Sequence, residues 1–274
     1  MKIFLLSLVS KAIFFFLNNK VGYYIIDDLF TIINKKTYNV KINDNLKLKI
    51  ATPNRLCLYR AKTFFTKEPD TILWLNEMDS NSIFWDIGAN VGLYSLYASL
   101  LKDCRTYAFE PSVFNLDLLA KNTFLNGLNE KVTIIPLALN DTNGSNTFNL
   151  SNIERGGALS SFSKIFDQNG EQMDVEFKYS ILGVTGDFML EKLNFTQPDY
   201  IKIDVDGIEH LILKGLINLL PNVKSILLEI SDDFKIQAEL SNKLLINAGF
   251  CLFKKTVTSP ELNQFNQWWI KIKK

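Results

Sequence analysis

The stretch Phe84-Trp85-Asp86-Ile87-Gly88-Ala89-Asn90-Val91-Gly92 decides the fold of this chain. It begins within an apolar run that starts at residue 82 and ends at an acid, and an amphipathic segment over residues 93–101 follows it. This order is typical of a strand, a tight loop and a helix. Glycine in such a loop lets the backbone pass close to a ligand, because it has no Cβ atom.

The spacing within this loop indicates the kind of ligand. It is G-x-N-x-G, which differs from the G-x-G-x-x-G of dinucleotide-binding proteins. Asp86, just before the first glycine, suits a ligand whose amino-acid end carries an ammonium group. S-adenosylmethionine is such a ligand, so the loop predicts a methyl-donor site.

Composition narrows the class of protein further. The 274 residues carry 30 Lys and Arg against 29 Asp and Glu, a net charge of +1. This balance argues against a large nucleic-acid surface, and we expect no nucleic-acid partner. The three cysteines, Cys57, Cys104 and Cys251, show no zinc or redox spacing. We therefore expect free thiols in a reducing, cytoplasmic compartment.

The N-terminal region is strongly apolar over residues 3–17. It is shorter than the roughly 20 apolar residues that span a bilayer, and no small-residue cleavage site follows it. The favoured interpretation is a helix docked on the protein or on a second subunit of a homodimer. The alternative is peripheral contact of residues 1–17 with the inner face of the membrane.

Residues 1–80 are predicted to form an N-terminal appendage in front of the glycine loop. Its alternating apolar and polar residues around positions 43–45 are typical of a β-hairpin. The appendage is predicted to contain, in order, a helix over 21–34, hairpin strands over 38–42 and 46–50, an irregular segment or further strand over 55–65, and a helix from its N-cap Thr66 to residue 78.

Residues 81–274 are predicted to form one domain of the α/β class. Strand and helix patterns alternate, which indicates a mainly parallel sheet with helices on both faces. Only residues 142–186 break this rhythm, with short polar stretches. The predicted strands cover residues 82–86, 105–110, 132–137, 200–205, 225–230, 250–254 and 266–272, and the predicted helices cover residues 93–101, 113–126, 187–193, 209–219 and 234–248.

Acids follow two of the other predicted strands. Glu110 ends the second strand, about 20 residues after the glycine loop, where two carboxylate oxygens can accept both hydrogen bonds of a ribose diol. The fourth strand is followed by Asp204, Asp206, Glu209 and His210, the only histidine of the chain. All of these would lie near the glycine loop if the fourth strand neighbours the first.

Four segments in this order and spacing resemble the FkbM-type S-adenosylmethionine-dependent methyltransferases: residues 86–92, 109–111, 122–127 and 202–215. The resemblance runs from about residue 68 to residue 230. It implies a Rossmann-like methyltransferase sheet of seven strands in the order 3-2-1-4-5-7-6. It also implies transfer of a methyl group to an oxygen, usually a hydroxyl of a sugar or polyketide, and hence a small-molecule or glycan acceptor.

The same resemblance implies roles for individual residues. Asp204 would lie near the methionyl and acceptor groups. The family commonly has Asp-Val-Glu-Gly where this chain has Asp204-Val205-Asp206-Gly207, and the shorter Asp206 opens the alternative that a water molecule or Glu209 takes over its role. The implied cofactor-binding residues are Asp86, Gly88, Asn90, Gly92, Glu110 and the segment from Ala138 to Asp141, which would flank the adenine.

Methyl transfer to a hydroxyl needs a base, because the hydroxyl loses a proton as it attacks. The intrinsic pKa of histidine suits His210 for this role, and Asp204 and Asp206 are the other candidates. The polar loop over residues 151–161 is interpreted either as a lid over the acceptor or as a solvated connection.

Other functions stay open from the sequence alone. A sugar oxidoreductase or epimerase that uses NAD would have a related sheet, although the loop lacks the third glycine. A non-catalytic, membrane-associated component could retain the fold, and methylation of a nitrogen or a protein side chain is compatible with the same residues. Asp204, Asp206, Glu209 and His210 are metal-ligand types, but the resemblance requires no metal and we expect none.

Overall fold

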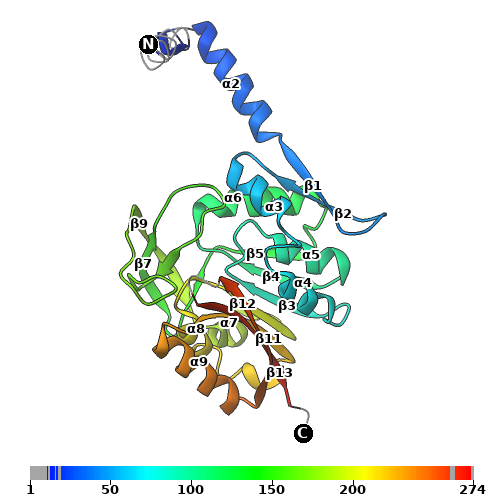
Figure 1. Cartoon of the computed structure of the whole chain (residues 1–274), viewed down its shortest axis with the longest axis vertical. Coiled ribbons are helices and arrows are strands. Elements are labelled where there is room, and N and C mark those ends of the chain that lie inside the picture. Colours follow the sequence, from blue (N-terminus) through cyan, green and yellow to red (C-terminus); the bar gives the residue numbers. More distant parts are fainter. Residues whose placement is uncertain (1–10, 12, 16, 18–19, 260–262, 273–274) are drawn as a thin grey trace.

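The computed structural model describes residues 11, 13–15, 17, 20–259 and 263–272 (Figure 1). Its centre is a seven-stranded sheet in the order β12-β13-β11-β10-β3-β4-β5. Six strands run in one direction, and β13 runs antiparallel to both of its neighbours, β11 and β12. Counted along the chain, this order is 3-2-1-4-5-7-6, so the predicted topology is confirmed. The strands are β3 (Ile83–Ile87), β4 (Arg105–Phe109), β5 (Val132–Ile135), β10 (Tyr200–Ile203), β11 (Ser225–Ser231), β12 (Phe250–Ser259) and β13 (Gln264–Lys271).

Helices cover both faces of this sheet, because successive side chains of a strand point to opposite faces. In β3, Phe84 packs in one core with Leu96, whereas Trp85 packs in the other core with Met189. The first face carries α4 (Pro69–Asn76), α5 (Leu93–Leu101) and α6 (Val113–Leu125), and the second carries α7 (Gly186–Leu193), α8 (Glu209–Lys214) and α9 (Lys235–Asn247).

The predicted hairpin is confirmed, with β1 (Thr37–Lys41) antiparallel to β2 (Lys47–Ala51). It packs on the face of α5 and α6, where the backbone N–H of Ala51 donates to Oδ1 of Asn122 at 2.8 Å. Leu48 and Ile50 are buried in the same core as Phe84. The hairpin thus shares a core with the main sheet, while the division of the chain at residue 80 stays a prediction.

Residues 55–65 were expected to be irregular or a strand, and this prediction is wrong. They contain the helix α3 (Arg55–Lys62), whose N-cap Asn54 accepts a hydrogen bond from the backbone N–H of Cys57 at 2.8 Å. Cys57 and Ala61, one helical turn apart, are both buried. The cap and this spacing favour a helix over the weak strand pattern. The next helix, α4, has Glu68 rather than Thr66 at its N-cap.

A second sheet, which the sequence patterns do not predict, lies in the region where the β-α rhythm breaks. Its order is β6-β9-β7-β8, with β6 (Ala138–Leu139), β7 (Gly144–Leu150), β8 (Ser160–Phe162) and β9 (Phe177–Val184). Much of β9 and the first half of β7 are exposed. A strand with so few buried positions gives little apolar alternation in the sequence.

The helix α2 (Lys20–Asn34) confirms the predicted helix before the hairpin and extends away from the rest of the molecule in Figure 1. Most of residues 1–17, for which docking or membrane contact was predicted, lie outside the described residues. Among the helices that the structure describes, none combines the length and the apolar character that crossing a bilayer requires.

Candidate active site

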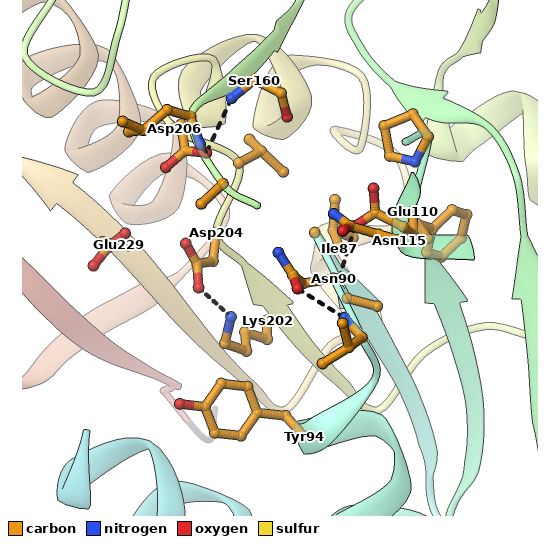
Figure 2. Close-up of a pocket in the computed structure, with 18 of the residues that line it drawn as sticks. Ile87, Asn90, Tyr94, Glu110, Asn115, Ser160, Lys202, Asp204, Asp206 and Glu229 are labelled. Carbon is orange, nitrogen blue, oxygen red and sulfur yellow. Dashed lines mark hydrogen bonds and ion pairs between the residues drawn. The ribbon is translucent and has the colours of Figure 1, made fainter. Parts of the chain in front are cut away.

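A cavity of about 340 Å³ lies at the carboxyl ends of β3, β4 and β10 (Figure 2). Because β3 pairs with both β4 and β10, the segments that follow these three strands meet at one edge of the sheet. This is the edge at which sheets of this kind bind their ligands. Glu110 after β4, and Asp204 and Asp206 after β10, all line the cavity.

The glycines of the loop between β3 and α5 are required by close packing. At Gly88, where φ is +85°, a Cβ atom would lie 1.9 Å from the backbone oxygen of Asp204. At Gly92, where φ is +86°, a Cβ atom would lie 2.4 Å from Cδ1 of Leu119. Gly88 therefore lets the loop touch the end of β10 and also lines the cavity, whereas Gly92 lets α5 pack on α6 and does not line it.

Glu110 joins the glycine loop to the end of β4. Its Oε2 accepts a hydrogen bond from the backbone N–H of Asn90, and its Oε1 accepts one from that of Ser112, both at 2.7 Å. Burial raises the pKa of Glu110 to about 7, although these hydrogen bonds act in the opposite direction. Glu110 thus faces the cavity as a buried acid held by backbone donors, and its contact with a ribose stays a prediction.

Asp86 does not line the cavity. The hydroxyl of Ser95 donates to its Oδ2 at 2.5 Å, while its Oδ1 has no hydrogen-bond partner among the described residues. Burial raises the pKa of Asp86, and the nearby charge of Lys202 opposes this shift. The contact of Asp86 with an ammonium group therefore stays a prediction, since this carboxyl is buried and is not among the groups that line the cavity.

Lys202 and Asp204 form an ion pair in the cavity, with Nζ and Oδ2 2.6 Å apart. The lysine side chain is only 2% exposed, and its ammonium group lies 5.0 Å from the centre of the Tyr94 ring. Burial alone would raise the pKa of Asp204, but Lys202 lowers it to about 2. Asp204 is therefore an anion at neutral pH and a weak base.

Glu229 in β11 lies beside Asp204 in the same cavity (Figure 2). Burial and the charge of Asp204 raise the pKa of Glu229 well above its usual value. Its Oε1 accepts a hydrogen bond from the hydroxyl of Thr258 at 3.1 Å. Asp204 is thus the carboxylate of the pair, while Glu229 keeps its proton to higher pH than an ordinary glutamic acid and in that form can donate a hydrogen bond.

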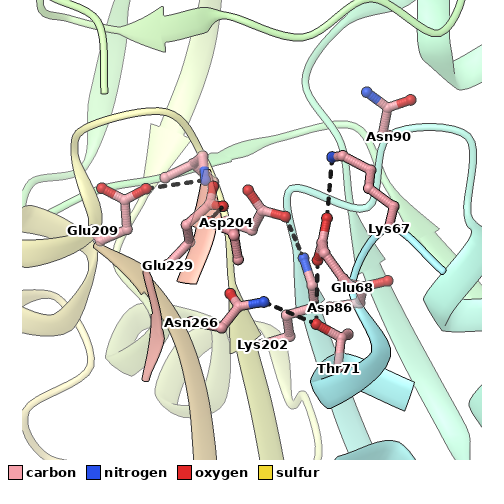
Figure 3. A network of polar contacts seen from close by, with 12 residues as sticks. Lys67, Glu68, Thr71, Asp86, Asn90, Lys202, Asp204, Glu209, Glu229 and Asn266 are labelled. Carbon is pink, nitrogen blue, oxygen red and sulfur yellow. Dashed lines mark hydrogen bonds and ion pairs between the residues drawn. The ribbon is translucent and has the colours of Figure 1, made fainter. Parts of the chain in front are cut away.

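A second polar chain borders Lys202 (Figure 3). Lys67 pairs with Oε1 of Glu68 at 3.1 Å, and Oε2 of Glu68 accepts a hydrogen bond from the hydroxyl of Thr71 at 3.1 Å. Asn266 of β13 in turn donates to Thr71 at 3.0 Å. The start of α4 is thereby fixed to β13, the second strand from one edge of the sheet. Lys67 and Glu68, just before α4, line the cavity.

Asp206 is held in a left-handed backbone conformation, with φ of +61°. Its Oδ2 accepts hydrogen bonds from the backbone N–H groups of Leu159 at 2.7 Å and Ser160 at 3.3 Å. Burial, followed by the charge of Asp204, raises the pKa of Asp206 to about 6. Both of these hydrogen bonds end on Oδ2. Among the described residues they leave Oδ1 of Asp206 available to a ligand in the cavity.

The loop over residues 151–161 forms a wall of the cavity and is tied to the body on several sides. Nε of Arg60 in α3 donates to the backbone oxygen of Gly156, and Nδ2 of Asn90 donates to that of Gly157, both at 2.7 Å. Asn115 in α6 accepts from the N–H of Gly156 at 2.9 Å. Together with the hydrogen bonds that Leu159 and Ser160 donate to Asp206, these contacts fix the loop as a cover of the cavity rather than a solvated connection.

The remaining candidate residues differ in position. Ala138 lines the cavity, whereas Asp141 does not and instead pairs with Lys214 at 2.9 Å. His210 also does not line the cavity; it is 7% exposed, and its ring packs edge-on against Phe234. Burial lowers the pKa of His210. In the described chain, no group of three or more acids, cysteines or histidines is arranged to hold a metal ion.

Several residues of the cavity were not predicted from the sequence, among them Lys67, Glu68, Tyr94 and Glu229. Glu229 carried a usable signal, because an acid within the apolar run of a central strand is rarely buried without a partner. Lys67, Glu68 and Tyr94 carried none, since their position depends on how α4 and α5 pack over the sheet.

The strand order, with β13 inserted antiparallel between β11 and β12, and the cavity at the strand ends define a Rossmann-like methyltransferase sheet. A sequence model of the methyltransferase FkbM domain matches residues 86–253, which is more than half of the chain. The chain therefore belongs to the FkbM methyltransferase family.

A curated relative is the hexuronic acid methyltransferase AglP of Haloferax volcanii. It is 29% identical to this chain over 166 residues, which cover 60% of this chain and 62% of the relative. The chain thus spans less than two thirds of the length of this relative.

Solved structures with a similar course of the chain include two methyltransferases. One is a precorrin-6y C5,15-methyltransferase from Geobacter metallireducens, with a TM-score of 0.45, 15% identity and coverage of 76% of this chain and 90% of that one. The other is the M1A22 tRNA methyltransferase TrmK of B. subtilis, with a TM-score of 0.42, 12% identity and coverage of 74% and 65%.

Proposed function

We propose that the protein transfers a methyl group from S-adenosylmethionine to a hydroxyl of a sugar or glycoconjugate. The observation that carries this proposal is the position of three acids, Asp204, Asp206 and Glu229, which line the same cavity as the glycine loop. Asp204 has a pKa of about 2, Asp206 one of about 6, and Glu229 one raised well above its usual value. A sugar presents several hydroxyls, which can donate to the carboxylates and accept from the protonated acid.

The cofactor half of the cavity is defined by Gly88, Asn90, Glu110 and the residues from Ala138 to Phe162 that line it. Glu110 can accept hydrogen bonds from a ribose, and the apolar side chains of Phe148 and Phe162 suit a purine ring. These features fit S-adenosylmethionine, which supplies a methyl group already activated on a sulfonium. The protein then mainly has to hold the acceptor in line with that group.

The acceptor half of the cavity is defined by Lys67, Tyr94, Lys202, Asp204, Asp206 and Glu229. Its two ionised aspartates would repel a carboxylate acceptor. A protonated amine would bind them but has no lone pair for methyl transfer. A hydroxyl is neutral, and it can both donate to the carboxylates of Asp204 and Asp206 and accept from Glu229. For this reason we favour transfer to oxygen. The name of the hexuronic acid methyltransferase relative supports a sugar as the acceptor.

Asp206 is the base in this proposal. It lines the cavity, and its pKa of about 6 leaves it ionised at neutral pH yet more basic than Asp204. General bases act best when their pKa lies near the working pH. Asp204 and Glu229 then orient the acceptor.

The free cysteines of the chain, two of them buried, support work in a reducing compartment such as the cytoplasm.

The test is methyl transfer from labelled S-adenosylmethionine to oligosaccharides that contain uronic acids and to their carboxyl-reduced counterparts. We expect a mass increase of one methylene on both substrates, and a methyl group that survives mild alkali, as an ether does and an ester does not. Alkali-labile label on the uronic acid alone would instead identify the carboxylate as the acceptor. Calorimetry that showed tighter binding of NAD than of S-adenosylmethionine would overturn the choice of cofactor.

A further inference from the structure

The helix α2 has an apolar surface that nothing in the described chain covers. Only Gly22 of its 15 residues is buried. Val21, Leu29, Phe30 and Ile32 are between 51% and 61% exposed. An isolated helix gains no stability from such exposure in water, so a partner for this surface is expected.

The apolar residues of α2 cover more than half of the helix circumference. At 100° per residue, they extend from Val21 through Leu29 to Tyr23, whereas Lys20, Asp27, Asp28 and Thr31 share the opposite side. The seam between two paired helices is narrower than this. A second copy of α2 would therefore leave much of the apolar surface in water, while a lipid surface covers a wide apolar face.

Charge and aromatic side chains support the same partner. Between residues 11 and 36 the chain carries four lysines and two aspartates. Lys20 lies at the start of α2, Lys35 and Lys36 follow its end, and all three are exposed. Tyr23 and Phe30, 68% and 60% exposed, belong to residue types that suit the boundary between headgroups and acyl chains.

The base of α2 is bonded to the cover of the cavity. Nη1 of Arg155 donates to Oδ1 of Asn34 at 3.3 Å, and Lys121 donates to the backbone oxygen of the same residue. Arg155 belongs to the loop that is pinned over the cavity through Gly156. A surface bound by α2 would therefore lie on the side of this cover.

We propose that α2 attaches the protein peripherally to an anionic lipid surface, with its apolar side in the interface and its lysines at the headgroups. This inference stands apart from the proposed function, since it does not depend on which acceptor is methylated.

The test is flotation of the full chain with vesicles of phosphatidylcholine alone and of phosphatidylcholine with phosphatidylglycerol. We expect binding mainly to the anionic vesicles and weaker binding at high salt. Leu29→Asp should weaken this binding by about tenfold or more, because it puts a charge on the apolar side. Thr31→Asp adds the same charge on the polar side and should change binding by less than about threefold.

Three outcomes would overturn the proposal: no binding of the wild-type chain to either vesicle, equal loss of binding in both variants, or equal binding to neutral and anionic vesicles. Light scattering adds a decisive comparison. A wild-type dimer that Leu29→Asp converts to a monomer, without vesicle binding, would assign α2 to a second copy of the chain. Binding of S-adenosylmethionine, measured by calorimetry on the same samples, reports on the proposed function separately and shows that both variants are folded.

Discussion

The proposed cofactor half and the proposed acceptor half of the cavity are formed by different parts of the chain and by different kinds of atom. In the cofactor half, Gly88, Asn90 and Glu110 come from one strand-loop-helix-strand unit, and backbone groups make most of the contacts. In the acceptor half, Lys67 and Glu229 come from segments far apart in the sequence, and charged side chains balance one another. Ligand binding in the first half should depend on the shape of the backbone, and ligand binding in the second half on the ionisation of side chains. Substitutions should therefore affect the two halves separately.

The largest effect is expected at Gly88. In Gly88→Ala the new methyl group would lie 1.9 Å from the backbone oxygen of Asp204, at a φ of +85° that side chains also disfavour. We expect a loss of at least about 3 kcal/mol of the free energy of unfolding and no measurable methyl transfer. Urea denaturation and an activity assay measure the two.

Gly127→Ala is the matched control. Gly127 has a positive φ of +65° as well, but no atom lies within 4 Å of the position of its Cβ. It should cost about 1 kcal/mol for the backbone conformation alone and leave activity intact. Equal costs at the two glycines would show that the contact with the end of β10 does not shape the site.

The next effect is expected at Asp206, in the acceptor half. Asp206→Asn keeps an oxygen that can accept from Leu159 but removes the base, so kcat should fall by about 10²- to 10⁴-fold. In the wild-type enzyme, kcat should rise with pH through about 6, because the base must be ionised. In the variant this rise should disappear.

His210 provides the comparison for the base, since it does not line the cavity. We expect His210→Gln to change kcat by less than about threefold and to leave the pH profile in place. A profile that disappears in His210→Gln and persists in Asp206→Asn would transfer the role of base to the histidine.

Two smaller effects, one on cofactor affinity and one on acceptor affinity, should distinguish the two halves of the cavity most directly. Glu110→Gln removes the charge that would accept from a ribose, so the Kd for S-adenosylmethionine should rise about 10- to 100-fold. Glu229→Gln should leave this Kd within about twofold and raise the KM for the acceptor. Calorimetry and steady-state kinetics measure these constants. Similar losses of cofactor affinity in both variants would mean that the two halves are not separate.

Sequence patterns predicted most of the main sheet because its strands are central and its helices amphipathic. Phe84 and Trp85 bury opposite faces of β3, and this gives a continuous apolar run that is easy to recognise. The helix α3 was missed because only two of its residues, Cys57 and Ala61, are buried, and this leaves a weak apolar pattern. The second sheet was missed because much of β9 is exposed.

The site was predictable to the extent that it follows strand ends. Glu110, Asp204 and Asp206 were placed at the edge of the sheet from the sequence, and all three line the cavity. Asp86 was placed at the same edge, but it does not line the cavity, and its carboxylate instead accepts a hydrogen bond from Ser95 in the first turn of α5. The pKa order of the three neighbouring acids could not be predicted, because it depends on burial and on the position of Lys202.

The smallest effect concerns stability, and it follows from the same buried acids. In the unfolded chain Glu110 titrates near its usual pKa of about 4.5, whereas in the folded chain its pKa is about 7. Between these values the folded state holds the extra proton, so the free energy of unfolding should fall as pH rises from about 4.5 to 7. In Glu110→Gln this fall should be smaller by about 1 to 2 kcal/mol, as measured by urea denaturation at pH values of about 5 and 7.5.

Glu130→Gln, at an exposed acid, is the control and should show the wild-type fall. If Glu110→Gln kept the full pH dependence, the proton would have to reside on another acid of the cavity, and the cofactor half would then depend on backbone shape alone.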